Sequence, residues 1–282
     1  MEKLIYTIAD LPVCMEMPFL PDISEESEPF LKPGEADRGP RIRLIPVDAL
    51  PPMPDGGIWH QDRYYAGETF HIRSGPGKDP YAVVDYGEND QIRILYLSDS
   101  GDMIPESSYL LNMLGLEKLL LGYEGLILHA SFIRWQGQGI LFSAPSGTGK
   151  STQASLWETH MGAKILNGDR AGIRYADGAW RAYGLPYAGS SRIFQNGSAP
   201  IRAIVVLKQG QENRIRPMGP MEALRALLPE FSAHRWDLAF MDKLLNVAAG
   251  LLRDVPLYCL ECRPDSEAVQ LLHNTLFNEE RL

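Results

Sequence analysis

Residues 143–152 read SAPSGTGKST and so place glycines, a lysine and several hydroxyl side chains within one short stretch. Gly147 and Gly149 allow the backbone to curl so that its N–H groups converge on an anion. The Lys150 ammonium adds a positive charge at the same place, and the Ser151 hydroxyl is suited to binding Mg²⁺. These residues indicate a loop that binds the phosphates of a nucleotide.

The neighbouring residues supply the strand and the helix that such a loop requires. Residues 139–142 are apolar and predict a buried strand, and a helix is expected from Ser151 to about His160, with Gly162 ending it. Ala144 replaces the first glycine of G-x-x-x-x-G-K-[ST], which disfavours a positive φ there. An ordinary serine- and glycine-rich turn is the alternative, and the flanking elements disfavour it. The expected contacts to ATP are Ser146, Gly147, Thr148, Gly149, Lys150, Ser151 and Thr152.

Two further side chains are candidates for chemistry at a terminal phosphate. Asp169 follows a strand predicted over residues 163–166, where a carboxylate can bind Mg²⁺ or accept a proton from an attacking hydroxyl. The alternative is a turn over residues 167–170, in which Asp169 bonds to its own backbone. His129 lies on a strand predicted over residues 126–135, and its alternative is a hydrogen-bonded structural histidine.

Two arginines and one loop are candidates for anion binding. Arg192 and Arg202 can clamp a transferring phosphoryl group, although most arginines lie on surfaces or in salt bridges. Gly189, Ser190 and Ser191 form a weaker candidate for a second anion nest.

These residues need a scaffold, and the pattern predicts an α/β protein with a mixed sheet behind the phosphate loop. A β-rich N-terminal subdomain is expected over residues 1–104, and the loop-containing domain over residues 105–282. Residues 25–57 are rich in Pro, Glu, Asp and Gly and predict mostly loop. Residues 105–121 predict one amphipathic helix. Its apolar stripe consists of Tyr109, Met113, Leu116 and Leu120.

The second half of the chain alternates strand and helix patterns. Asp177 and Gly178 predict a tight hairpin, and residues 201–207 predict a central strand. Helices are expected over residues 220–228, 239–252 and 266–277, and a strand over 255–262.

The segments over residues 128–133, 139–152 and 165–169 resemble the HPr kinase/phosphorylase family. That family has a histidine on the strand before its phosphate loop and an Ala-Asp-Asp motif on the next strand. The resemblance implies a fold shared with ATP-dependent phosphoenolpyruvate carboxykinases. Residues 183–189 and 254–260 look most similar to the HPr-kinase-like proteins of lasso-peptide and other modified-peptide pathways.

By this resemblance, His129 assists the acid/base step and Lys150 grips phosphates. Ser151 and Asp169 hold Mg²⁺, and Asp169 matches the second aspartate of the motif. Gly168 stands in place of the first aspartate, so one carboxylate of the family's pair is missing. The segment by which the family recognises HPr is not recognisable here, which makes HPr itself a poor candidate substrate.

Composition excludes several other classes. The net charge of −9 argues against a general nucleic-acid binder or an anionic-membrane binder. We expect a cytoplasmic protein, because the sequence shows neither a signal-peptide pattern nor an apolar run of about 18 residues. Cys259 and Cys262 lie on one predicted strand and should point to opposite faces, which favours packing over a metal or redox role.

We therefore expect an ATP- and Mg²⁺-dependent kinase that phosphorylates a hydroxyl, following the resemblance a serine of a peptide or protein. Asp169, His129, Lys150 and Arg192 are the expected catalytic residues. A kinase of a small hydroxyl metabolite and a regulatory nucleotide-binding protein without transfer are the alternatives. The sequence leaves open whether the chain forms a homo-oligomer.

Overall fold

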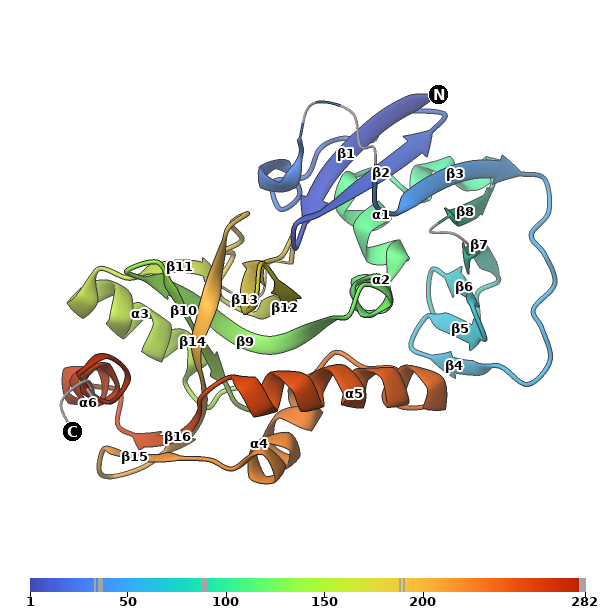
Figure 1. The fold of residues 1–282 in the computed structure, drawn as a ribbon. Coiled ribbons are helices and arrows are strands. Elements are labelled where there is room, and N and C mark those ends of the chain that lie inside the picture. Colours follow the sequence, from blue (N-terminus) through green and yellow to red (C-terminus); the bar gives the residue numbers. More distant parts are fainter. Residues whose placement is uncertain (33, 35–37, 88–90, 188, 190, 279–282) are drawn as a thin grey trace. The chain divides into compact units, whose positions relative to one another are not determined.

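A computed structural model describes residues 1–282 except 33, 35–37, 88–90, 188, 190 and 279–282. The chain divides into two units, Met1–Leu116 and Glu117–Leu282, each with its own packed interior (Figure 1). Among the described residues, none of the helices combines the length and the apolar character needed to cross a bilayer.

The described part of the first unit is built around an eight-stranded mixed sheet with the order β1-β2-β3-β8-β7-β6-β5-β4. The β3 strand pairs in parallel with β2 and β8, and the other neighbours are antiparallel. The strands are β1 (Glu2–Ile8), β2 (Leu11–Met17), β3 (Arg41–Val47), β4 (Ile58–His60), β5 (Arg63–Ala66), β6 (Thr69–Arg73), β7 (Pro80–Tyr86) and β8 (Gln91–Leu97).

One expectation for this part of the chain is wrong, and another missed a strand. The described residues among 25–57 are mostly loop, as expected, but they include β3, whose Ile42 and Leu44 are buried between exposed arginines. The single helix over residues 105–121 is two helices, α1 (Ser107–Leu114) and α2 (Leu116–Gly122). Gly115 adopts a φ of 64° and ends α1, and Tyr109 is exposed instead of facing the core.

The second unit confirms the α/β fold class. Its sheet has the order β10-β9-β12-β13-β14-β16-β15, and β11 pairs with β9. Because β10 also pairs with β14, the strands β10, β9, β12, β13 and β14 form a closed ring of pairings. The strands are β9 (Gly125–Trp135), β10 (Gln138–Ser143), β11 (Lys164–Asn167), β12 (Arg170–Ala176), β13 (Ala179–Gly184), β14 (Ser198–Gln209), β15 (Arg214–Pro217) and β16 (Leu257–Cys262).

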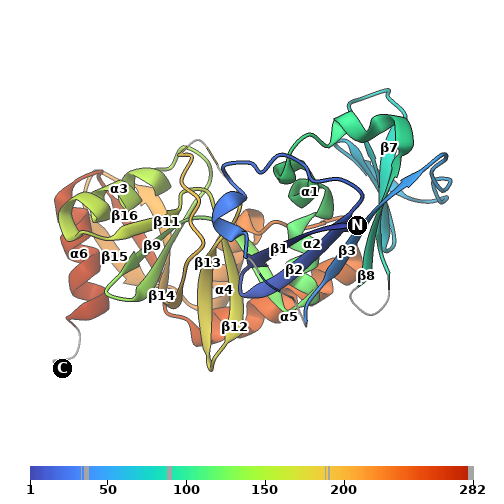
Figure 2. The same ribbon diagram turned by 90° about the horizontal axis from the view of Figure 1, so that it is seen from above.

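Helices cover both faces of this sheet (Figures 1 and 2). Buried side chains of the strands form one core cluster on each face. On one face, α3 (Lys150–Met161) lies beside α6 (Ser266–Phe277), with Trp157 and Leu272 fully buried. On the other face, α4 (Pro220–Leu227) and α5 (Leu238–Asp254) bury Leu227 and Leu244. The expected helices, the central β14 and the hairpin at Asp177 and Gly178 are confirmed; both hairpin residues have positive φ.

The arrangement of parallel strands determines where a ligand can bind. The strands β10, β14 and β16 run parallel, so their carboxyl ends meet at one edge of the sheet. Residues 144–149 follow β10 at that edge and lead into α3. Ligands of open α/β sheets bind at such an edge.

Replacing Leu272 by Ala tests the packing of α6. The side chain is fully buried, so Leu272→Ala should lower the free energy of unfolding by about 2–5 kcal/mol. Gln270→Ala on the exposed face of the same helix should change it by less than about 0.5 kcal/mol. Urea titrations followed by tryptophan fluorescence measure both, and equal effects would contradict this packing.

Candidate functional site

The loop over residues 144–149 has the backbone that its glycines predict. Gly147 and Gly149 have φ values of 78° and 118°, and a Cβ on either would meet open space within 4 Å, so the backbone conformation is what requires glycine there. Ala144 does not have a positive φ and its methyl group is buried in the core on the α3 face. Alanine in place of the motif's first glycine is therefore compatible with this loop.

The Lys150 side chain folds back beneath the loop. Its Nζ donates to the carbonyl oxygen of Ala144 at 2.8 Å and lies 3.4 Å from that of Pro145. Burial lowers the pKa of Lys150, whereas the charges of Glu230 and Asp169 raise it. The ammonium thus lies in a confined place, within the electrostatic reach of two carboxylates.

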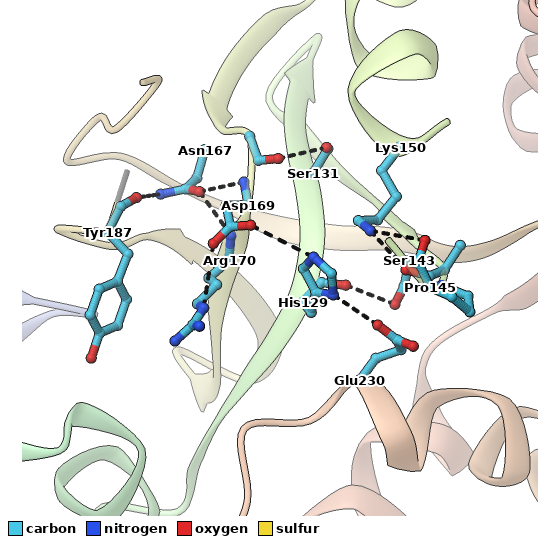
Figure 3. A network of polar contacts seen from close by, with 12 residues as sticks. His129, Ser131, Ser143, Pro145, Lys150, Asn167, Asp169, Arg170, Tyr187 and Glu230 are labelled. Atoms are coloured by element: carbon cyan, nitrogen blue, oxygen red, sulfur yellow. Dashed lines mark hydrogen bonds and ion pairs between the residues drawn. The ribbon is translucent and has the colours of Figure 1, made fainter. Parts of the chain in front are cut away.

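His129 lies beside this loop because β9 runs antiparallel to β10. Ser143, the last residue of β10, pairs with Ala130, and the Ser143 hydroxyl donates to the carbonyl oxygen of His129 at 3.0 Å. The imidazole Nδ1 lies 2.8 Å from Glu230 Oε2, and Nε2 lies 3.6 Å from Asp169 Oδ1 (Figure 3). The structure thus brings two of the predicted residues, His129 and Asp169, together.

The turn over residues 167–170 is stabilised by the side chain of Asn167 and not by that of Asp169. Its side-chain oxygen accepts from the backbone N–H groups of Asp169 and Arg170, at 2.8 and 2.9 Å. Its amide nitrogen donates to the carbonyl oxygens of Leu185 and Tyr187. The Asp169 carboxylate is consequently available to face His129 and Arg170 (Figure 3).

Gly168 lies where no side chain fits. A Cβ there would lie 2.0 Å from Ser191 Oγ and 2.7 Å from Ser191 Cβ. The Gly168 carbonyl oxygen accepts from the buried Ser131 hydroxyl at 3.0 Å, which fixes the turn between β11 and β12. In the family that this chain resembles, an aspartate occupies this position; here its Cβ would overlap Ser191.

Glu230 is the main residue that the sequence analysis missed. It ends a short 3₁₀ turn after α4, and the next residue, Phe231, forms a β-bridge with Leu128 of β9. The N–H of Ser232 donates to the Ile127 carbonyl oxygen at 2.9 Å. These contacts hold Glu230 against His129 across 101 residues of sequence, a separation that no local pattern reveals.

Arg170 also belongs to this cluster and was not among the predicted site residues. Its Nε lies 3.4 Å from Asp169 Oδ2, and its guanidinium lies over the Tyr187 ring at 5.1 Å. The side chain is partly exposed, so the guanidinium can be reached from solvent. Arg170 is therefore a second cation beside the Asp169 carboxylate.

The other predicted anion-binding residues have different outcomes. Arg202 is wrong as a phosphate clamp: it lies near the start of the β10–β14 pairing, away from the loop, and donates to the Leu276 carbonyl oxygen at the end of α6. Arg192 is exposed, with a φ of 50°, and its N–H donates to the carbonyl oxygen of Gly189. Gly189 packs directly on Asp169. Ser190 lies outside the described residues.

A pocket of about 710 Å³ opens on the other side of the loop, over the ends of β14 and β16. Its walls include Gly147, Thr152, Gln209, Cys262 and Arg263. Cys259 and Cys262 are free thiols, and Cys262 packs against the core on the α3 face. Because side chains alternate along β16, Cys259 belongs to the opposite face. The β10 strand lies between β9 and β14, so the pocket and the His129 cluster flank the loop on its two sides.

The residues present fit a nucleotide with Mg²⁺. Gly149 caps α3 without a side-chain hydrogen bond, which leaves the first N–H groups of the helix available to phosphate oxygens. Ser151 is exposed in the first turn of α3, and Asp169 supplies a carboxylate. The described residues contain no cluster of three or more His, Cys, Asp or Glu that could hold a metal. Mg²⁺ does not require one, because it binds through one or two protein ligands plus phosphates and water.

Comparisons with known proteins give one family. The family model described as "SynChlorMet cassette protein ScmC" matches residues 113–266, more than half of the chain. Curated proteins provide no match. Among solved structures, the HPr(Ser) kinase/phosphatase from Coxiella burnetii aligns over 55% of this chain and 90% of its own, with 13% identity and a TM-score of 0.32. A TM-score this low does not establish a common fold.

Adding a methyl group at residue 168 tests the close packing of the turn. Gly168→Ala should lower the free energy of unfolding by about 1–3 kcal/mol, because its Cβ overlaps Ser191. Ser191→Gly in the same chain removes the overlapping atoms and should restore most of the loss. Urea titrations of the two single variants and the double variant measure this, and a Gly168→Ala variant as stable as the wild type would contradict it.

Proposed function

This chain belongs to the family of the SynChlorMet cassette protein ScmC, and we propose that it is a kinase that uses ATP and Mg²⁺ to phosphorylate a hydroxyl. The observation that carries the proposal is the meeting of an imidazole and a carboxylate beside a phosphate-binding loop. A loop that only held a nucleotide would not need His129 and Asp169 at this edge. Phosphoryl transfer needs groups that position the attacking oxygen and accept its proton.

The two sides of the loop differ, and we assign one substrate to each side. The pocket over β14 and β16 has the size and the mixed polar lining of a small-ligand site, and we assign it to the nucleoside. The side formed by β9 and β12 carries His129, Asp169 and Arg170, and we assign it to the acceptor. The loop between them would then hold the phosphates.

Each residue has a role that its position supports. Bound ATP would supply the phosphoryl group, and Mg²⁺ would neutralise part of the negative charge of the phosphates. The loop N–H groups and Lys150 bind phosphate oxygens, and Ser151 and Asp169 bind the metal. His129, together with Asp169, receives or orients the acceptor proton. Arg170 and Arg192 are the candidates to bind the equatorial oxygens, and Arg202 is not.

The acceptor we propose is a serine of a peptide or protein. The resemblance to HPr-kinase-like proteins of modified-peptide pathways favours it, and the half-exposed Asp169 and Arg170 side chains leave the reacting side accessible to a larger molecule. A cytoplasmic location accords with the use of ATP and with the free thiols of Cys14, Cys259 and Cys262. A small hydroxyl metabolite is the alternative acceptor.

Label transfer from γ-labelled ATP tests the function directly. With Mg²⁺ present, mass spectrometry of candidate serine peptides and small hydroxyl compounds should reveal a phosphorylated product. His129→Ala should lower the rate about 100-fold or more while ATP still binds, because it removes only a group on the acceptor side. Asp169→Asn should lower the rate at least as much and also weaken binding of ATP with Mg²⁺, because it removes a proposed metal ligand. Lys150→Met should instead abolish ATP binding in calorimetry.

Two substitutions serve as matched controls. His160 and Asp242 are exposed on α3 and α5, so His160→Ala and Asp242→Asn should leave both transfer and binding unchanged. Unchanged transfer in His129→Ala and Asp169→Asn would contradict the proposed chemistry. ATP binding without transfer to any acceptor would favour a regulatory nucleotide-binding protein.

Alkylation of Cys262 tests the assignment of the nucleoside pocket. Burial raises the pKa of the Cys262 thiol, so its reaction with iodoacetamide should be slow at neutral pH and accelerate as the pH rises towards 9 and above. ATP should slow this reaction, because it would cover the pocket wall. Peptide mapping separates Cys262 from the buried Cys259, and a rate that ATP leaves unchanged would contradict the assignment.

A further inference from the structure

The hydrogen bond between His129 and Glu230 has no assigned role in the reaction as described above. We infer that Glu230 is a positioning residue, which holds the His129 imidazole in the tautomer and orientation that let Nε2 accept the proton of the attacking hydroxyl. This inference rests on the proposed phosphoryl transfer and assigns its proton acceptor.

The contact with Glu230 determines the tautomer of His129. Glu230 Oε2 lies 2.8 Å from His129 Nδ1, which is hydrogen-bond distance, and the Glu230 side chain is only 10% exposed. A carboxylate accepts hydrogen bonds, so Nδ1 must carry the proton in this pair. The Nε2 of a neutral imidazole then has a free lone pair.

The other ring nitrogen, Nε2, faces Asp169. It lies 3.6 Å from Asp169 Oδ1, beyond the length of a good hydrogen bond, and it points to the side of the loop on which Asp169 lies (Figure 3). An acceptor hydroxyl beside Asp169 can therefore donate to Nε2. A carboxylate that orients an imidazole from behind, with the other nitrogen facing the reacting group, is the arrangement of serine hydrolase triads.

The turn before β12 supplies a single carboxylate, that of Asp169. Gly168 provides none, and Asp169 alone would have to serve both the metal and the acceptor proton. With Glu230 behind His129, the imidazole takes the proton and Asp169 is left to the metal. Glu230 comes from the turn after α4, and the Phe231–Leu128 bridge fixes it independently of the β11–β12 turn.

In the proposed reaction, phosphoryl transfer is accompanied by the transfer of one proton. The acceptor oxygen forms a bond to the γ-phosphorus, and the bond from that phosphorus to the β–γ bridging oxygen breaks, its electron pair leaving with ADP. The hydroxyl proton moves to His129 Nε2, and Glu230 stabilises the positive charge that the imidazole acquires.

A double-mutant cycle tests whether Glu230 acts through His129. Glu230→Ala should lower kcat about 10- to 100-fold with little change in the KM for ATP, and Glu230→Gln, whose amide oxygen still accepts from Nδ1–H, should retain most of the activity. In a chain that already carries His129→Ala, Glu230→Ala should cause no further loss. Glu222→Ala, on the exposed part of α4, is the matched control.

A readout independent of activity comes from the ¹⁵N NMR shifts of the His129 side chain at neutral pH. The wild type and Glu230→Gln should show a proton on Nδ1 and none on Nε2, and Glu230→Ala should shift the population towards the Nε2–H tautomer.

The possible results separate the two proposals. A wild-type Nε2 that carries a proton, a tautomer unaffected by Glu230→Ala, or equal rate losses from Glu230→Ala with and without His129 would overturn the inference. The last result would indicate that Glu230 acts through Lys150 or through folding. Absence of transfer by the wild type would remove the proposed function, whereas the NMR result would still decide whether Glu230 sets the tautomer.

Discussion

The charge of Lys150 is the constraint on which the site depends. The Lys150 side chain is buried under a loop, where loss of hydration lowers its pKa and disfavours the charged form. Glu230 and Asp169 counteract part of this effect, and the two carboxylates come from different elements, the turn after α4 and the turn before β12. The two carboxylates that act on Lys150 are therefore the same two that flank His129. The proposed phosphate binding and the proposed proton transfer would depend on one set of charges.

The register of β9 determines where His129 lies relative to these charges. Residue 130 pairs with the last residue of β10, and residue 129 pairs with the first residue of β12, so His129 must lie between the loop and Asp169. A shift of one residue would turn the imidazole to the other face of the sheet. The register is held by the alternation of Leu128, Ala130 and Phe132 into the core, all of which are fully buried. Packing on the far side of the strand thus determines where the imidazole points.

The parts that could be predicted from sequence are those that local chemistry determines. Glycine spacing predicted the loop, Gly162 the end of α3, and the Asp177–Gly178 pair the hairpin. Where a local signal competed with another, the prediction was wrong or incomplete: Gly115 divided a helix whose apolar periodicity looked continuous, and the alternation in β3 was hidden within a Pro- and Glu-rich stretch. The assignment of Arg202 was wrong because its type suggests an anion clamp, while its register places it near the start of the β10–β14 pairing, away from the loop after β10.

Glu230 could not be predicted, because 101 residues separate it from His129 and no local sequence pattern links the two. The turn before β12 supplies one carboxylate, Asp169, and residue 168 is a glycine whose Cβ would overlap Ser191. His129 has only two nitrogens, and Nε2 faces Asp169, so a second carboxylate can bind only at Nδ1. Glu230 occupies that position, and the β-bridge between Phe231 and Leu128 brings it there through backbone pairing that the sequence does not reveal.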